Sequence, residues 1–219
     1  MKCYTKTFSE KHNITFHNHA CFSFECGEYS CLMDPWLSSS IFNGAWRLLF
    51  EEKVNIQNLR YIFISHEHPD HFHIPSLKYI RDNCETEITV CIPNRNNKNM
   101  KESLEKLGFK TKEFTSGSKE NLGEFSCCYF KKGHDNTLVF ELDDTVMVNQ
   151  NDCYLSSEEA QYIKELYPKI DIWWMQFSLA GYYANEDDPQ GLANAQKFHR
   201  ELFKSYHKIF TPRIAIPFA

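Results

Sequence analysis

Four of the ten histidines in this 219-residue sequence fall within eight consecutive positions. They lie in the segment Ser65-His66-Glu67-His68-Pro69-Asp70-His71-Phe72-His73. In an extended turn His66 and His68 can point to the same side, while Asp70 and His71 can turn back toward a neighbouring point. Imidazole nitrogen and carboxylate oxygen are ligands for zinc and also for iron or manganese. The spacing therefore predicts a metal-binding loop, and a polar loop that is rich in histidine by chance is the weaker explanation.

Two further side chains are suited to complete an open site with one or two metal ions. His134 lies in a polar turn between two predicted strands, and Asp152 follows a predicted strand that ends at Asn149. Each residue alone is typical of an ordinary turn. Their order after the histidine segment favours a role as ligands instead. The predicted metal ligands are His66, His68, Asp70, His71, His134 and Asp152.

Such a site predicts hydrolytic chemistry. A metal ion with an open coordination position lowers the pKa of bound water from about 16 to about 7, which supplies a metal-bound hydroxide at neutral pH. Asp70 is the predicted catalytic residue, because it would orient this water or accept its proton. An N-cap on the following helix is the alternative role for Asp70, and the two roles are compatible. The expected substrate is an ester, a phosphodiester, a lactone or an amide.

Glycine spacing excludes three other kinds of active site. The eight glycines are never closer than six positions apart. A dinucleotide fingerprint, a nucleophile elbow and a Walker A loop need glycines two, four and five positions apart. The formal net charge of −5 and the lack of a basic stripe in the sequence also argue against a nucleic acid partner. We therefore expect a small-molecule substrate.

Cysteine usage and hydropathy bear on the compartment. The nine cysteines form no C-x-x-C pair, and several lie in apolar, strand-like segments. That usage is typical of buried thiols in a reducing compartment, so we expect a cytoplasmic protein. No apolar stretch approaches the ~18 residues that a membrane span needs. The sequence leaves the oligomeric state open.

The histidine segment begins at the end of residues 61–65, a short apolar stretch that predicts a strand buried on both faces. The C-terminal end of such a strand usually presents functional groups. Around it, two similar halves each predict strands followed by alternating strands and helices, which favours two packed sheets with helices outside. The predicted strands are 14–25, 29–33, 61–65, 88–92, 112–114, 125–131, 137–141, 145–149, 170–175 and 209–216. The predicted helices are 75–83, 99–107, 157–167 and 191–206.

These motifs and this order of elements resemble the metallo-β-lactamase-fold superfamily, whose α/β fold is a four-layer αββα sandwich with one or two metal ions at its edge. The resemblance covers nearly the whole chain and implies a single domain over residues 1–219. It implies that His66, His68 and His134 hold the first ion and that Asp70 and His71 contribute to the second. It further implies that Asp152 bridges both ions. Zinc is the expected cofactor, with iron or manganese as alternatives.

A narrower resemblance rests on His17-Asn18-His19-Ala20, Leu32-Met33-Asp34-Pro35-Trp36-Leu37 and Asn149-Gln150-Asn151-Asp152-Cys153. These segments resemble the branch that contains N-acyl-phosphatidylethanolamine phospholipase D, lactonase-like hydrolases and CMP-N-acetylneuraminate hydroxylase-like proteins. The hydroxylase-like members make an iron-dependent oxidoreductase the alternative function. No cysteine in this chain is followed two positions later by histidine, as a Rieske cluster requires. An oxidoreductase of this kind would therefore take electrons from a partner chain.

The end of the sequence departs from the family pattern. Many members complete the second metal site with a histidine on a late strand, where this chain has Pro217. His199 and His207 fall on the preceding predicted helix, where we expect them at the surface. The chain ends two residues after Pro217, so we leave open whether the predicted domain lacks a terminal element. A non-catalytic member with an incomplete second site is therefore a third hypothesis.

The remaining candidates lie around the predicted ligands. We expect Asp34 and His19 to orient ligand imidazoles, although a plain turn residue and a packed strand residue are the ordinary alternatives. His73 is expected just beyond the ligands, and Trp36 is expected at the substrate pocket. Trp46, Trp173, Trp174, Tyr182 and Tyr183 are further candidates for the pocket wall, with core packing favoured for Trp173 and Trp174.

Overall fold

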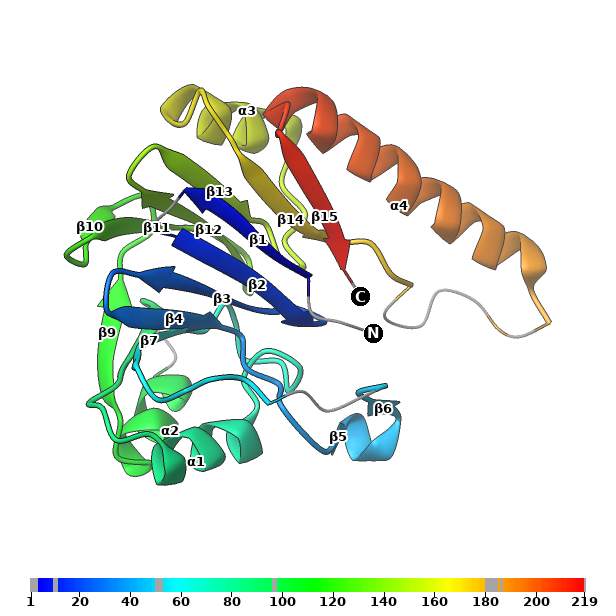
Figure 1. Cartoon of the computed structure of the whole chain (residues 1–219). Helices are drawn as coiled ribbons and strands as arrows, with labels where there is room; N and C mark the ends of the chain where they lie inside the picture. Colours follow the sequence, from blue (N-terminus) through cyan, green and yellow to red (C-terminus); the bar gives the residue numbers. More distant parts are fainter. Residues whose placement is uncertain are drawn as a thin grey trace.

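Two β-sheets pack face to face, and helices cover their outer faces, as Figure 1 shows. This computed structural model describes residues 4–9, 12–49, 53–95, 98–179, 185 and 187–218. Three clusters of buried apolar side chains separate the layers: one between the sheets and one under each pair of helices. The predicted αββα sandwich is confirmed.

The first sheet has seven strands in the order β1 (Tyr4–Ser9), β2 (His12–Asn18), β3 (Cys21–Cys26), β4 (Tyr29–Met33), β7 (Leu59–Phe63), β8 (Thr89–Pro93) and β9 (Lys110–Phe114). Strands β1 to β4 are antiparallel, and β4, β7, β8 and β9 run parallel. Helices α1 (Ile74–Asn83) and α2 (Asn99–Lys106) cover its outer face (Figure 1). The parallel strands bring the residues that follow β4 and β7 to one edge.

The second sheet has six strands in the order β10 (Lys119–Asn121), β11 (Phe125–Lys132), β12 (Asp135–Leu142), β13 (Thr145–Asn149), β14 (Ile172–Gln176) and β15 (Ile214–Phe218). Helices α3 (Ser157–Leu166) and α4 (Pro189–Phe210) pack on its outer face. The short strands β5 (Ser40–Ile41) and β6 (Trp46–Arg47) flank a 3-10 turn, η1 (Phe42–Gly44), beside the sandwich.

Aromatic rings hold the two sheets together. Phe22 of β3 stacks on Trp174 of β14 with ring centroids 4.4 Å apart and planes 7° apart. Trp174 is 1% exposed, and Trp173 points into the other core layer, where it is fully buried. Burial of such large apolar groups is worth about 25 cal/mol per Å2 and sets the distance between the sheets. Core packing of Trp173 and Trp174, the favoured expectation, is thus observed.

Local sequence signals account for the starts of two helices. Ser156 and Glu159 form the predicted capping box at α3, in which each side chain accepts from the other residue's backbone N–H. Helix α1 begins after His73, whose Nδ1 accepts from the backbone N–H of Ser76, and Pro75 lies in its first turn. The N-cap role considered for Asp70 therefore belongs to His73.

Two predicted elements differ from the observed ones. The predicted strand 14–25 is a hairpin, because a turn at His19 and Ala20 separates β2 from β3. The predicted strand 209–216 begins only at Ile214, because α4 continues to Phe210 and ends at Thr211, which has a left-handed φ of 42°. Strands β1, β5, β6 and β10 were not predicted. Among the described helices, none combines the length and apolar character that a membrane crossing requires.

Candidate metal centre

The centre is built where β4 and β7 end side by side. Asp34 follows β4, and its carboxylate accepts from the backbone N–H of Ser65 (2.8 Å) and from the Ser65 hydroxyl (2.7 Å). Both residues are fully buried. These bonds fix the loop that carries the histidine segment to the adjacent strand. Ser65 had no predicted role, and its position directly before His66 was the only signal for one.

Asp34 and Ser65 also set the orientation of two imidazoles. His71 Nδ1–H donates to Asp34 Oδ2 at 2.8 Å, so His71 Nε2 faces away from Asp34. The Ser65 hydroxyl gives its proton to Asp34 and accepts from His66 Nδ1–H at 2.9 Å. Each ring thus turns Nε2 toward the centre, and this nitrogen carries a lone pair when the imidazole is neutral. This arrangement is the usual support of metal-binding histidine. His66 Nε2 lies 2.9 Å from His68 Nδ1, which can donate to it in the absence of a metal ion.

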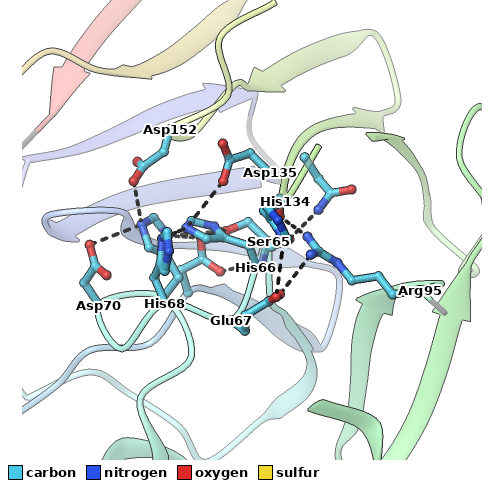
Figure 2. Close-up of polar contacts among 12 residues, drawn as sticks. Ser65, His66, Glu67, His68, Asp70, Arg95, His134, Asp135 and Asp152 are labelled. Atoms are coloured by element: carbon cyan, nitrogen blue, oxygen red, sulfur yellow. Dashed lines mark hydrogen bonds and ion pairs between the residues drawn. The ribbon is translucent and has the colours of Figure 1, made fainter. Parts of the chain in front are cut away.

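Three overlapping groups of side chains converge at this edge, each with its ligand atoms within 4.8 Å of one another. We call them the outer group (His66, His68 and Asp135), the bridging group (His66, His71 and Asp152) and the inner group (His19, Asp70 and His71). Figure 2 shows His66, His68 and Asp70 on one loop, with Asp135 and Asp152 facing them from other segments. Five of the six predicted ligands therefore lie together, and His134 does not.

Several buried polar atoms in these groups lack partners among the described residues. Asp70 Oδ1, Asp152 Oδ1 and His71 Nε2 make no hydrogen bond there. His71 Nε2 lies 3.4 Å from Asp70 Oδ2 and 3.4 Å from Asp152 Oδ2, which is too long for a strong charge-assisted bond. Buried polar groups are normally satisfied. A cation among these atoms would satisfy all three, so the donor set fits a bound metal.

The protonation states also suit metal binding. Burial, with the nearby His71, lowers the pKa of His66 to about 2, so this imidazole is neutral at pH 7. Burial alone would raise the pKa of Asp70, but contacts with His19 and His71 hold it well below its usual range. Burial likewise opposes ionisation of Asp152, and His71 reverses the effect and lowers its pKa. The centre therefore offers neutral imidazole and ionised carboxylates.

His71 has the opposite shift. Burial lowers its pKa, but the carboxylates of Asp152 and Asp34 outweigh burial and raise the pKa well above the ordinary value. The pKa of Asp34 is raised by its own burial, although His71 and Ser65 counteract this. A positive charge at His71 Nε2 thus balances the surrounding carboxylates, and either a proton or a metal ion can supply it.

The structure places His134 outside the three groups. Its side chain is 87% exposed, and its Nδ1 lies 3.8 Å from Glu67 Oε1. The next residue, Asp135, points inward with Oδ1 3.8 Å from His66 Nε2, as Figure 2 shows. The expectation that His134 completes the outer site is therefore not met by the geometry, which offers Asp135 instead.

Hairpin register explains this difference. Lys132 of β11 pairs with Asp135 of β12, which leaves Gly133 and His134 as the two-residue turn. Gly133 has a φ of 60°, as hairpin turns with glycine at the first central position require. Arg95 bonds the carbonyl oxygen of His134 and lies 2.9 Å from Glu67, so it fastens this turn to the histidine loop. The Gly133-His134 pair is itself a signal for a two-residue hairpin turn, and it would have predicted that His134 lies at the tip of the hairpin.

Asp152 is carried by a braced loop after β13. Gln150 donates to the Cys153 carbonyl oxygen at 2.8 Å and accepts from Trp173 Nε1 at 2.9 Å. Asn151 adopts a left-handed φ of 53°, which turns the chain back toward the centre. Asp152 is 20% exposed at its side chain and reaches His71 across the sheet edge. The loop thus holds this carboxylate between the outer and inner groups.

The other predicted residues lie around the centre in different ways. Asp34 contacts the imidazole of His71, a predicted ligand, whereas His73 caps α1 and contacts Ser76 (2.7 Å) without joining any of the three groups. Trp36 is 3% exposed, with its ring centroid 5.7 Å from that of His19. Tyr182 and Tyr183 lie outside the described residues.

Two cavities open beside these residues. One of about 480 Å3 is lined by Phe42, Trp46, His68, Asp70, Asp152, Gln176 and Leu179. A neighbouring cavity of about 560 Å3 includes His19, Trp36, Trp46 and Phe218 in its wall. Trp46 belongs to both walls. The first cavity combines apolar side chains with three of the predicted ligands, His68, Asp70 and Asp152, which is the usual make-up of a small-molecule site.

The late strand supplies no ligand side chain to the inner group. Pro217 lies in β15, at the edge of the second sheet, where a missing N–H is tolerated. His199 is 2% exposed, so the expectation of a surface position is wrong for this residue, whereas His207 is exposed. Neither histidine belongs to any of the three groups.

Sequence comparison finds relatives that match part of the chain. Cytidine monophosphate-N-acetylneuraminic acid hydroxylase of Danio rerio is 32% identical over 71 residues, which are 31% of this chain and 12% of the relative. The protein of the same name from Mus musculus is 37% identical over 73 residues, again 31% of this chain and 12% of the relative. The match thus spans about an eighth of these relatives.

Solved structures match over almost the whole chain. CmlA, a diiron beta-hydroxylase from Streptomyces venezuelae, has a TM-score of 0.70 at 14% identity over 98% of this chain and 46% of CmlA. The metallo-beta-lactamase fold protein YhfI from Bacillus subtilis has a TM-score of 0.54 at 18% identity over 91% of this chain and 88% of YhfI. At these identities the likeness concerns the fold. Residues 13–172 match the family described as beta-lactamase superfamily domain, and the chain therefore belongs to that metallo-β-lactamase superfamily.

Proposed function

We propose that this chain is a non-haem iron enzyme that hydroxylates a small organic substrate with dioxygen. The observation that carries the proposal is the outer group, in which His66, His68 and Asp135 offer two imidazoles and one carboxylate. That combination with open positions is the ligand pattern of non-haem iron oxygenases. Asp70 and Asp152 make the whole centre rich in carboxylate, which suits two iron ions. The hydroxylases among the similar proteins support the same reaction class.

Bound iron would supply the activation of dioxygen. The overall reaction inserts one oxygen atom into a substrate C–H bond, reduces the other to water, and consumes two electrons and two protons. Because the sequence has no Cys-x-His pair for a Rieske cluster, we propose that a partner protein delivers the electrons. A cytoplasmic location agrees with such a partner and stays a prediction.

The residues of the chain would divide the work of binding and orientation. His66, His68 and Asp135 would hold one ion, Asp70 and His71 would hold the other, and Asp152 would lie between the two. Ser65 and Asp34 would keep the imidazoles in the required tautomer. The apolar side chains of Phe42, Trp46 and Leu179 would seat the substrate in the 480 Å3 cavity next to His68 and Asp152.

Metal-dependent hydrolysis is the second candidate function. The exposure of His68 at the wall of this cavity favours it, because water reaches the outer group there. A bound zinc or manganese ion would supply an activated water molecule. Asp70 would then take the proton, provided that it is not occupied as a ligand, and the substrate would be an ester, a phosphodiester, a lactone or an amide.

Metal analysis and oxygen uptake separate the two candidates. The protein is purified without added metal, its metal content is measured, and the protein loaded with ferrous iron is then mixed with dioxygen and a chemical reductant. Hydrolysis of bis(p-nitrophenyl) phosphate and of a simple lactone is assayed in parallel. Iron at two ions per chain with oxygen uptake that is lost in Asp135→Asn supports the proposal. Zinc with hydrolysis and no oxygen uptake supports the second candidate, and absence of metal binding overturns both.

A further inference from the structure

His19 lies at the inner end of the centre, in the turn between β2 and β3. It is 7% exposed, and its φ of 38° is left-handed, so the turn directs the chain sharply at this residue. His19 Nε2 lies 2.9 Å and His71 Nε2 lies 3.4 Å from Asp70 Oδ2, and one ligand atom of each of the three residues lies within 4.8 Å of the others. A residue from the start of the chain thus meets two residues of the histidine loop.

Hydrogen bonds among the described residues do not satisfy every polar atom of the inner group. His19 Nε2–H can donate to Asp70 Oδ2, but Asp70 Oδ1 and His71 Nε2 remain buried without a hydrogen bond among the described residues. Because His71 Nδ1 already donates to Asp34, His71 has only Nε2 left to offer. Two ring nitrogens and a carboxylate that point at one another form a cation site more readily than a hydrogen-bond network.

Aromatic packing holds the His19 ring in this direction. The rings of Trp36, Trp46 and Phe218 meet it edge to face, with centroids 5.7, 5.9 and 5.7 Å away. Phe218 follows Pro217 in β15, the strand that brings no ligand side chain to the centre. The side of the inner group next to β15 is therefore occupied by His19, which arrives from the opposite sheet.

We propose that His19 is a direct ligand of the inner metal ion, together with Asp70 and His71, and takes the place of a ligand from the late strand. This proposal rests on the proposed metal centre. It changes the role of His19 from a residue that orients other ligands to a residue that binds the ion. It also makes the second metal site complete despite Pro217.

Cobalt(II) binding to the wild-type chain, His19→Asn and His17→Asn tests the proposal. Asparagine tolerates the left-handed backbone at position 19 but is too short to replace the imidazole. The control makes the same change two residues earlier, where the ring contacts Ser23 and belongs to none of the three groups. Equilibrium dialysis gives the number and affinity of the ions. Proton NMR of the loaded protein counts the paramagnetically shifted, exchangeable N–H signals of coordinated imidazoles.

We expect two ions in the wild-type chain and in His17→Asn. In His19→Asn we expect one ion to bind as before and the second at least about tenfold more weakly, with one shifted imidazole signal lost. An unchanged number of shifted signals in His19→Asn overturns the proposal, whatever the affinity, because His19 would then only orient Asp70. If the wild-type chain binds no cobalt, the metal centre itself is refuted. Two ions without His19 as a ligand refute only this inference.

A measurement on the unmodified protein guards against misfolding of the variant. In crystals of the cobalt-loaded wild-type chain, anomalous scattering locates each ion. An ion about 2.1 Å from His19 Nε2 supports the proposal, because that is the usual bond length to imidazole nitrogen. An ion that is bound by Asp70 and His71 but not by His19 overturns it.

Discussion

The outer and inner groups of the metal centre differ in exposure. In the outer group His66 is buried, but His68 is exposed and the side chain of Asp135 is 27% exposed, whereas the three residues of the inner group are all at most 7% exposed. An exposed ligand exchanges readily with water or substrate, and a buried one must be satisfied within the protein. The comparison indicates that the outer ion would meet the substrate and that the inner ion would anchor the centre.

The two groups also differ in support. In the inner group, His71 Nδ1 donates to Asp34, which also accepts from the Ser65 hydroxyl. Three aromatic rings pack around the His19 ring. On the outer side, Arg95 and Glu67 fasten the turn that carries Asp135, and the Glu67 side chain is 43% exposed. More supporting contacts therefore surround the buried charges, which is consistent with the cost of leaving a buried charge unpaired.

The largest expected effect comes from removing His71, compared with removing His68. In the metal-free protein His71→Ala leaves the buried Asp34 carboxylate without its charged partner and with only the Ser65 hydrogen bonds, so we expect a loss of about 3–5 kcal/mol in the free energy of unfolding. His68→Ala removes an exposed side chain together with its 2.9 Å contact with His66 Nε2, and should cost about 1 kcal/mol. Urea denaturation in the presence of a chelator measures both. Equal losses would break the distinction between the inner and outer groups.

Metal removal should come next in size. A ligand at about 100 times its dissociation constant adds about 2.7 kcal/mol to stability, so chelation should lower the melting temperature by roughly 5–10 °C. Because His68 and Asp135 of the outer group are open to solvent and all three residues of the inner group are buried, the outer ion should leave first and the inner ion more slowly. Stopped-flow release into a coloured chelator would show two phases. A single phase with both ions released together would contradict the assignment.

Asp135→Asn and His134→Asn form a matched pair at neighbouring positions. Asp135→Asn removes a carboxylate that faces His66. Loss of a residue that only supports a metal ligand usually weakens binding by about tenfold or more, so the affinity for the outer ion should fall by more than about tenfold. The second changes a side chain at the tip of the hairpin and should leave both ions unaffected. Isothermal titration with Fe2+ under anaerobic conditions measures the affinities. The reverse result would restore His134 as a ligand.

The smallest expected effect is at the contact between Glu67 and Arg95. Glu67→Gln weakens a partly exposed ion pair, so the change in stability should stay within about 1 kcal/mol and the outer ion should lose less than about fivefold in affinity. Glu87→Gln, which removes an exposed partner of Lys110 far from the centre, is the control. A loss of affinity for the outer ion as large as that in Asp135→Asn would mean that the position of the hairpin turn depends on the ion pair between Glu67 and Arg95.

Much of the fold could be predicted from the sequence because its signals are local. The capping box of Ser156 and Glu159 and the apolar stretch of β7 lie within a few neighbouring residues. The hairpin between β2 and β3 was missed because no glycine, proline or two-residue turn signal marks His19 and Ala20. The end of α4 was missed because Ile209 and Phe210 are apolar in either a helix or a strand.

Part of the metal centre could also be predicted. The sequence by itself determined the chemistry of the donors, since imidazole and carboxylate are properties of single residues and five predicted ligands share one loop or follow one strand. Only the tertiary structure decided which side chains converge. Hairpin register directs Asp135 rather than His134 to the centre, and the strand order of the first sheet, in which β3, β4 and β7 are neighbours, brings His19 to Asp70, 51 positions away. The hairpin register is local, and the glycine at position 133 signals it. The approach of His19 to Asp70 depends on strands that are distant in the chain, and spacing along one segment does not encode it.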